Sequence, residues 1–243
     1  MILGVGLAGL AAAAFVVIAI ATGLLLNDTT RPVSVEEIVR RFHAGTVRPD
    51  ELEGVYVYRT SGRESIDALG GALHRYPGET TITVRKTSCG IELRWQPLEG
   101  RATTWTMCPT ASGPELTVNA EEHTFFGSDD TTTYACKGSV IGTTRRSFTC
   151  TSDRGVEHGT IAPQGSTVVT VGRAGLPVLH ATSVARVSGG DKGTETVEWW
   201  LDPHTGLPAR IVLTSATSRK VLLRPVHYRE QARLELVSLV PRR

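Results

Sequence analysis

The 243-residue sequence lacks the motifs that mark common enzyme sites. It contains no G-x-S-x-G nucleophile elbow, no H-E-x-x-H metal motif and no G-x-x-x-x-G-K-S/T phosphate loop. Its seven histidines occur singly along the chain rather than in clusters. We therefore expect a protein that is not an enzyme and that uses no metal ion and no cofactor.

Blocks of basic residues are also missing. The 26 lysines and arginines are spread along the chain and are nearly balanced by 24 acidic residues, which leaves a formal net charge of +2. A nucleic-acid-binding surface requires a basic patch, commonly interleaved with aromatic residues. Nucleic acid is therefore not an expected partner.

Charged side chains are absent altogether from residues 1–26. As a helix, the apolar run Ile2–Leu26 would be ~37 Å long, enough to cross a hydrocarbon core of roughly 30 Å. We therefore expect a transmembrane anchor over residues 1–26, followed by a juxtamembrane linker and short helix over residues 27–49. The alternative is a cleaved signal peptide, because Ala19-Ile20-Ala21 matches the A-x-A cleavage pattern, although the apolar run is longer than such peptides use.

Cysteine is scarce, with only Cys89, Cys108, Cys136 and Cys150. Their spacing does not contain the C-x₂₋₄-C pairs of a zinc site, and an even number beside a membrane anchor indicates disulfides formed in an oxidising compartment. Of the three possible pairings, Cys89–Cys108 with Cys136–Cys150 is favoured, because each bond then closes one short loop between neighbouring strands. Four reduced cysteines in a cytoplasmic domain are the alternative.

Two signals disagree about the side of the membrane on which residues 50–243 lie. Arginines follow the apolar run and no basic residue precedes it, so the positive-inside rule alone would place the domain in the cytoplasm. Disulfides form outside the cytoplasm. We give the cysteines more weight, and expect a single-pass protein of the cell membrane whose C-terminal domain is extracytoplasmic.

A short helix is predicted before the β-rich region. Ser34 and Glu37 have the spacing of a capping box, and the apolar side chains of residues 35–42 recur on one face at helical spacing. We expect this helix to close one end of a β core.

From residue 54 onward the pattern is that of β-strands. Stretches such as Glu79–Arg85 and Ile91–Trp95 alternate in polarity, and glycines and prolines separate them. Residues 110–130 and 152–165 have loop composition, and we expect two halves of one domain to meet near residues 110–130. The predicted fold is mainly β: a curved antiparallel sheet or half-barrel with a short capping helix.

The most specific pattern is a strand, a tight turn and a returning strand over residues 197–213. Residues 202–206 supply the turn, in which Gly206 is free to adopt a positive φ. Trp199 and Trp200 are adjacent and therefore face opposite sides of the strand. One of them should fill the core, and Trp200 is expected to line a groove.

The W-x-D-x-x-T-G-L-P-x-R pattern of residues 200–210 resembles the bacterial lipoprotein-carrier and lipoprotein-sensor superfamily, which includes the lipoprotein localisation factors. The resemblance implies a strongly curved, unclosed antiparallel sheet, with helices on its concave face around an apolar cavity that holds a lipid. The chain departs from this group because it has one convincing helix after the anchor and no lipobox cysteine.

A second candidate cluster lies in the turn-rich residues 67–79, which carry His74 and Tyr76. Together with His123 and Phe125-Phe126 they are expected to form a polar-aromatic site. The expected ligand-binding residues are therefore Trp200, His74, Tyr76, Phe125 and Phe126.

Two functions follow from these features. The first is a membrane-anchored extracytoplasmic binding domain of the bacterial cell envelope, non-catalytic, which holds a lipid or other apolar ligand in a cavity of several hundred Å³. The alternative is an envelope protein-interaction or sensor module, with a filled core and an exposed apolar patch around Tyr76, Phe125 and Phe126.

Overall fold

The computed structural model describes residues 30–45, 50–221 and 224–243. The expected anchor over residues 1–26 lies outside the described residues, as does part of the expected linker. Within the described ranges, no helix is long and apolar enough to cross a membrane.

The described part of the chain consists mainly of β-strands, with one short α-helix and one 3-10 turn, which confirms the mainly β prediction. The strands are β1 (Gly54–Ile66), β2 (Ala72–Arg75), β3 (Glu79–Lys86), β4 (Ile91–Leu98), β5 (Arg101–Thr110), β6 (Gly113–Phe125), β7 (Ser128–Lys137), β8 (Arg146–Thr151), β9 (Gly155–Val171), β10 (Ala174–Gly189), β11 (Asp191–Leu201), β12 (Pro208–Val221) and β13 (Arg224–Leu236). The helical elements are α2 (Val35–Gly45) and η1 (Ala68–Gly70).

All strands belong to one curved antiparallel sheet, in the order β13-β12-β11-β10-β9-β8-β7-β6-β5-β4-β3-β1-β2. In addition, β1 pairs with β13, and Tyr58 and Arg59 lie in register with residues of both β3 and β13. The two partners therefore occupy opposite edges of β1. The short β2 pairs with the last residues of β1, beyond the end of β3. The sheet therefore closes on its first strand, whereas the expected half-barrel would be open.

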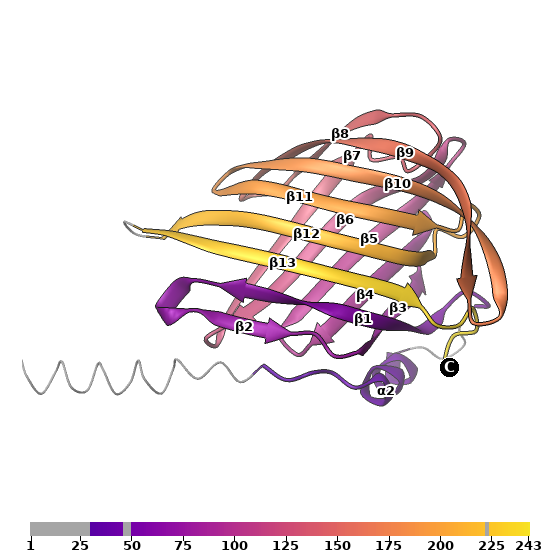
Figure 1. The fold of residues 1–243 in the computed structure, drawn as a ribbon, viewed down its shortest axis with the longest axis horizontal. Coiled ribbons are helices and arrows are strands. Elements are labelled where there is room, and N and C mark those ends of the chain that lie inside the picture. The colour runs from indigo at the N-terminus through magenta and orange to yellow at the C-terminus, as the bar shows by residue number, and fades with distance from the viewer. Residues whose placement is uncertain (1–29, 46–49, 222–223) are drawn as a thin grey trace, which may run out of the picture.

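The closed sheet is flattened into two layers whose strands cross at an angle (Figure 1). Trp105 of β5 and Trp199 of β11 meet between the layers, with ring centroids 5.5 Å apart. The Tyr58 hydroxyl of β1 donates a hydrogen bond of 2.7 Å to the carbonyl oxygen of Pro208 at the start of β12. Because side chains from both layers interlock, the interior is largely filled.

Helix α2 lies on the outer face of the sheet. The Glu37 amide donates to the Ser34 hydroxyl over 3.2 Å, which caps the start of the helix as its sequence predicts. Ile38 and Phe42 then pack against Val55 of β1, in a small cluster separate from the main core. Successive side chains of a strand point to opposite faces, and Tyr56 points into the main core, so Val55 points outward. The helix therefore covers the outer face of the sheet and not one of its ends, where it was expected.

The two stretches with loop composition are strands. Residues 110–130 form most of the β6–β7 hairpin, and residues 152–165 form the first half of β9. Their inward positions include Asn119, Glu121 and Glu157, so the polarity of these strands does not alternate as a strand facing an apolar core would. The polar composition that predicted loops in these two stretches is thus explained by strands whose inward side chains face a polar interior.

The favoured cysteine pairing is confirmed. Cys89, in the turn before β4, is bonded to Cys108 of β5. Cys136 of β7 is bonded to Cys150, which lies directly opposite it in β8.

Candidate functional site

The interior has an apolar half and a polar half. The alternation that directs Tyr58 and Thr60 of β1 inward also directs Glu64 inward, where it is fully buried. Strands β5 and β13 likewise place Arg101 and Glu230 inside, with 1% and 2% of their surfaces exposed. Charged groups are rarely buried to this degree unless they are paired.

Glu64 is held by two histidines. Nδ1 of His74 lies 2.8 Å from one carboxylate oxygen, and Nδ1 of His123 lies 3.3 Å from the other. Burial raises the pKa of Glu64, but the hydrogen bonds from His123 and His74 and the charge of Arg101 outweigh it and lower the pKa to about 2. Glu64 therefore carries a negative charge inside the molecule.

Arg101 balances a second buried carboxylate. Its guanidinium contacts both oxygens of Glu230, at 2.7 Å and 3.0 Å from Nη2, and donates over 2.6 Å to the Thr103 hydroxyl. The Tyr228 hydroxyl lies 3.0 Å from Glu64 and 2.9 Å from Glu230. Because a hydroxyl carries one proton, Tyr228 donates to only one of these carboxylates at a time.

The structure brings together most of the predicted polar-aromatic cluster. His74 stacks on Phe125 with ring centroids 4.8 Å apart, and the Tyr76 hydroxyl donates to Glu230. Tyr76 and Phe125 are buried, at 7% exposure each, so they do not form the exposed apolar patch that the interaction module requires. The polar side chains around them form hydrogen bonds with one another. A ligand-binding role for this cluster stays a prediction.

Two predicted site residues lie elsewhere. Phe126 is half-buried in the β6–β7 turn and has a positive φ of 54°. Trp199 fills the core, and Trp200 lies on the outer face of β11. There Trp200 stacks on His180 at 4.1 Å, and the Arg210 guanidinium covers it at 5.1 Å.

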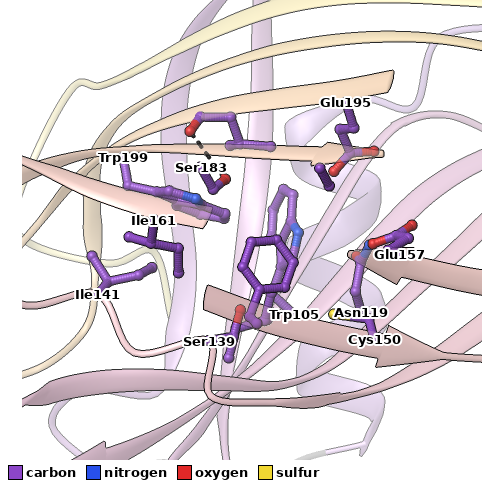
Figure 2. A pocket seen from close by; sticks show the side chains of 14 residues that line it. Trp105, Asn119, Ser139, Ile141, Cys150, Glu157, Ile161, Ser183, Glu195 and Trp199 are labelled. Carbon is purple, nitrogen blue, oxygen red and sulfur yellow. Dashed lines mark hydrogen bonds between the residues drawn. The ribbon is translucent and has the colours of Figure 1, made fainter. Parts of the chain in front are cut away.

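A second group of polar side chains surrounds a void of about 30 Å³ between β6, β9 and β11 (Figure 2). Asn119, Glu157 and Glu195 line the void, beside Trp105 and Trp199. Burial and the nearby charge of Glu121 raise the pKa of Glu157 to about 8. The same two causes, together with Glu157 itself, raise the pKa of Glu195.

Ion pairs close the polar end of the sheet. Arg219 of β12 lies 2.6 Å from Asp191 of β11 and 3.3 Å from Asp130 of β7. Asp130 also pairs with Arg154 in the β8–β9 turn. Because β7 and β12 are far apart in the strand order, these pairs link the two layers.

The opposite, apolar end carries a pocket of about 540 Å³, which we call the end pocket. Its lining combines apolar side chains and prolines with a polar rim: Asp50, Glu51, Leu52, Glu53, Val84, Lys86, Gly90, Ile91, Met107, Pro109, Thr110, Gly113, Pro114, Pro203, His204, Thr205 and Gly206. The turn of the hairpin singled out by its sequence therefore forms one wall.

Hydrogen bonds within that turn fix its shape. Asp202 accepts from the His204 amide and from the Thr205 hydroxyl, each over 2.9 Å. Gly206 follows with a φ of 74°, a conformation that favours glycine. A Cβ atom at Gly206 would lie 3.6 Å from Ile91, so the backbone of the turn closely approaches the pocket floor.

The sequence pattern singled out this hairpin and predicted that Trp200 would line a groove. The structure places the turn, and not Trp200, on the wall of the end pocket, and binding by Trp200 stays a prediction. The sequence-based predictions also missed Glu64, Arg101 and Glu230. The available signal was a charged residue in phase with the inward positions of a strand, as Glu64 is with Tyr58. Across the described ranges, no group of three or more His, Cys, Asp or Glu side chains is arranged to hold a metal ion.

Comparisons with known proteins give little further information. No family model matches the sequence, and no curated protein matches it significantly. Among solved structures, the chain is similar to the hypothetical lipoprotein YmcC from Escherichia coli K12, at 10% sequence identity and a TM-score of 0.32, over 83% of this chain and 97% of that one. A likeness at this level carries no argument about function. The lipoprotein-carrier resemblance thus stays confined to the hairpin at residues 200–210.

Proposed function

We propose that this chain is a membrane-anchored, non-catalytic binding domain on the extracytoplasmic side of the bacterial cell envelope. We further propose that it binds the apolar part of a lipid or other amphipathic ligand in the end pocket. The single observation that carries the proposal is the contrast between the two hollow regions of the molecule.

The polar half of the interior offers a void of about 30 Å³, too small for any lipid chain, whereas the end pocket has about 540 Å³. Small-molecule sites commonly measure roughly 300–1,000 Å³ and combine an apolar wall with a few polar groups. A ligand therefore fits at the end of the sheet and not inside it, where the resemblance had placed the cavity.

The composition of the end pocket suits an amphipathic ligand. Ile91 and Met107 are almost completely buried and form an apolar floor. At the rim, Lys86 pairs with Asp50 over 2.9 Å, and Glu53 accepts the Lys86 amide over 2.9 Å. An apolar group on the floor would leave the polar end of its ligand beside these side chains.

The proposed location rests on other residues. Residues 1–26 are long and apolar enough to anchor the chain. The two disulfides of the structure are typical of proteins outside the cytoplasm. A non-catalytic role is supported by the pairing of the buried titratable groups with one another around Glu64 and Arg101.

The test uses residues 30–243, which contain the closed sheet, its core and both disulfides. The fluorescence of N-phenyl-1-naphthylamine, a neutral apolar probe, should rise saturably on binding. Ile91→Trp, which places a larger ring on the floor of the end pocket, should weaken probe binding at least ten-fold. Val168→Trp places the same side chain at a site on β9 that is 65% exposed, and should leave binding unchanged. Equal binding by both variants would refute the end pocket as the site.

A second candidate function is protein interaction through the β9–β10 hairpin. In the described part of the chain, β9 pairs with β8 only as far as Ile161, and β10 pairs with β11 only from Leu179 onward. The tip of the hairpin thus has two free strand edges, and Val168 on it is exposed. A free, uncharged edge is suited to adding a strand of another protein. Val168→Lys should then weaken a complex isolated from membranes and spare probe binding.

A further inference from the structure

We propose that the void between β6, β9 and β11 is a binding site for a hard divalent cation of the size of Ca²⁺. The carboxylates of Glu157 and Glu195 and the amide oxygen of Asn119 are its protein ligands, and water completes the coordination. Figure 2 shows these three residues around the void. The site is separate from the end pocket and does not depend on the proposed function.

The first observation is an orphaned oxygen. Asn119 is 4% exposed, and its Oδ1 atom has no hydrogen-bond partner among the described residues. The same side chain is hydrogen-bonded to Glu121, which acts as an acceptor, so the amide nitrogen faces Glu121 and the oxygen is left over. Buried side-chain oxygens nearly always have a partner, and an exception calls for an unseen water or ion.

The second observation is a shortage of positive charge. Glu64 and Glu230 are balanced by Arg101 and the histidines, and His123 also pairs with Glu121. The carboxyl groups of Glu157 and Glu195 make no hydrogen bond or ion pair in the described part of the chain. Two carboxyl groups near a third acid, Glu121, therefore line a small void without a counter-ion among the described residues.

The third observation is the space itself. A void of about 30 Å³ exceeds the roughly 10–15 Å³ that one water requires, and it would equally hold one cation with a water. The hydroxyl of Ser183, which also lines the void, donates to the Val197 carbonyl over 3.2 Å. Its oxygen lone pairs therefore remain available as a further ligand.

The ligand chemistry selects the type of cation. Ca²⁺ takes carboxylate, amide, hydroxyl and water oxygens in irregular geometries. Mg²⁺ demands a nearly regular octahedron, and Zn²⁺ prefers thiolate and imidazole ligands, which the void does not offer. An isolated pair of protonated carboxyl groups around a single water is the competing arrangement.

The test uses the full chain, purified in a non-ionic detergent, stripped with chelator and dialysed. Equilibrium dialysis against ⁴⁵Ca²⁺ should give about one ion per chain, with a dissociation constant on the order of 10⁻⁴ to 10⁻³ M, as in extracellular calcium modules. Thermal unfolding should shift upward by a few degrees at saturating Ca²⁺ and less with Mg²⁺. Tryptophan fluorescence is a suitable readout, because Trp105 and Trp199 line the void.

The double variant Glu157→Gln, Glu195→Gln removes both charges with little change in volume and should bind Ca²⁺ at least ten-fold more weakly. Glu198→Gln is the matched control, because Glu198 lies on the outer face of β11 beside His180. It should bind like the wild type. If the void holds only water, the chain will bind no stoichiometric Ca²⁺ and show no thermal shift, and this result would overturn the proposal. Equal Ca²⁺ binding by the double variant and the wild type would overturn it as well.

Discussion

Trp105 of β5 and Trp199 of β11 meet edge to face in the centre of the molecule, with ring planes at 83°. The contact joins two strands that belong to opposite layers of the same closed sheet. It explains why a sheet with this many strands encloses so little empty space.

Trp199→Ala should therefore destabilise the protein by about 3–5 kcal/mol, the usual effect of removing a large buried aromatic ring. Trp200→Ala is the control on the neighbouring position, and it should change the free energy of unfolding by no more than about 1 kcal/mol. Urea unfolding followed by circular dichroism measures both. Similar losses in the two variants would contradict the inward assignment of Trp199.

Arg101→Met should destabilise the protein by about 3–5 kcal/mol, because it leaves the buried Glu230 carboxylate without its partner. The double variant Arg101→Met, Glu230→Gln removes both charges. It should recover part of this loss, and the recovery measures the coupling between the two residues. A double variant as unstable as the sum of the two single variants would mean that the ion pair contributes nothing.

Stability should fall in acid because of Glu64. Its pKa is about 2 in the folded protein and 4.5 in the reference state, so the folded state favours the ionised form. The stabilisation is present above pH 4.5 and is lost as the pH falls toward 2, with a total on the order of 3 kcal/mol.

The measurement is the free energy of unfolding between pH 6 and pH 3. Glu64→Gln should flatten the acid side of this profile, and Glu36→Gln, on the exposed surface of α2, should not. An unchanged profile in Glu64→Gln would refute the assignment.

Loss of either disulfide should cost about 3 kcal/mol in the chain-entropy model, because each bond closes a loop of 14 or 19 residues. Cys136→Ser, Cys150→Ser and the corresponding variant of the other pair can be compared by their unfolding midpoints. Native protein should also resist thiol alkylation until it is reduced. Rapid alkylation of unreduced protein would contradict the pairing and reopen the question of compartment.

The sequence predicted correctly those features that depend on residues close together in the chain. Alternation located the strands around an apolar interior, such as β4, and short spacing identified the partners of Cys136 and Cys89. It failed for β6 and the first half of β9, because their inward residues face a polar interior and so do not contrast with the outward ones.

The remaining features depend on contacts between distant segments. Nothing near Glu64 in sequence indicates that Arg101 and Tyr228 will surround it. The hairpin at residues 202–206 was recognised, but its function as the wall of a pocket depends on β4 and β5, which lie a hundred residues earlier.

The seam between β1 and β13 has a consequence for biogenesis. Until the last strand is delivered, β1 and β12 both expose hydrogen-bonding edges, which invite pairing between chains. The joining of the first strand to the last also gives the fold a high contact order and a slow folding rate. An incomplete chain therefore passes through an open state with unpaired strand edges, which ends only when β13 pairs with β1 and β12. Truncations before Arg224 should accumulate as aggregates.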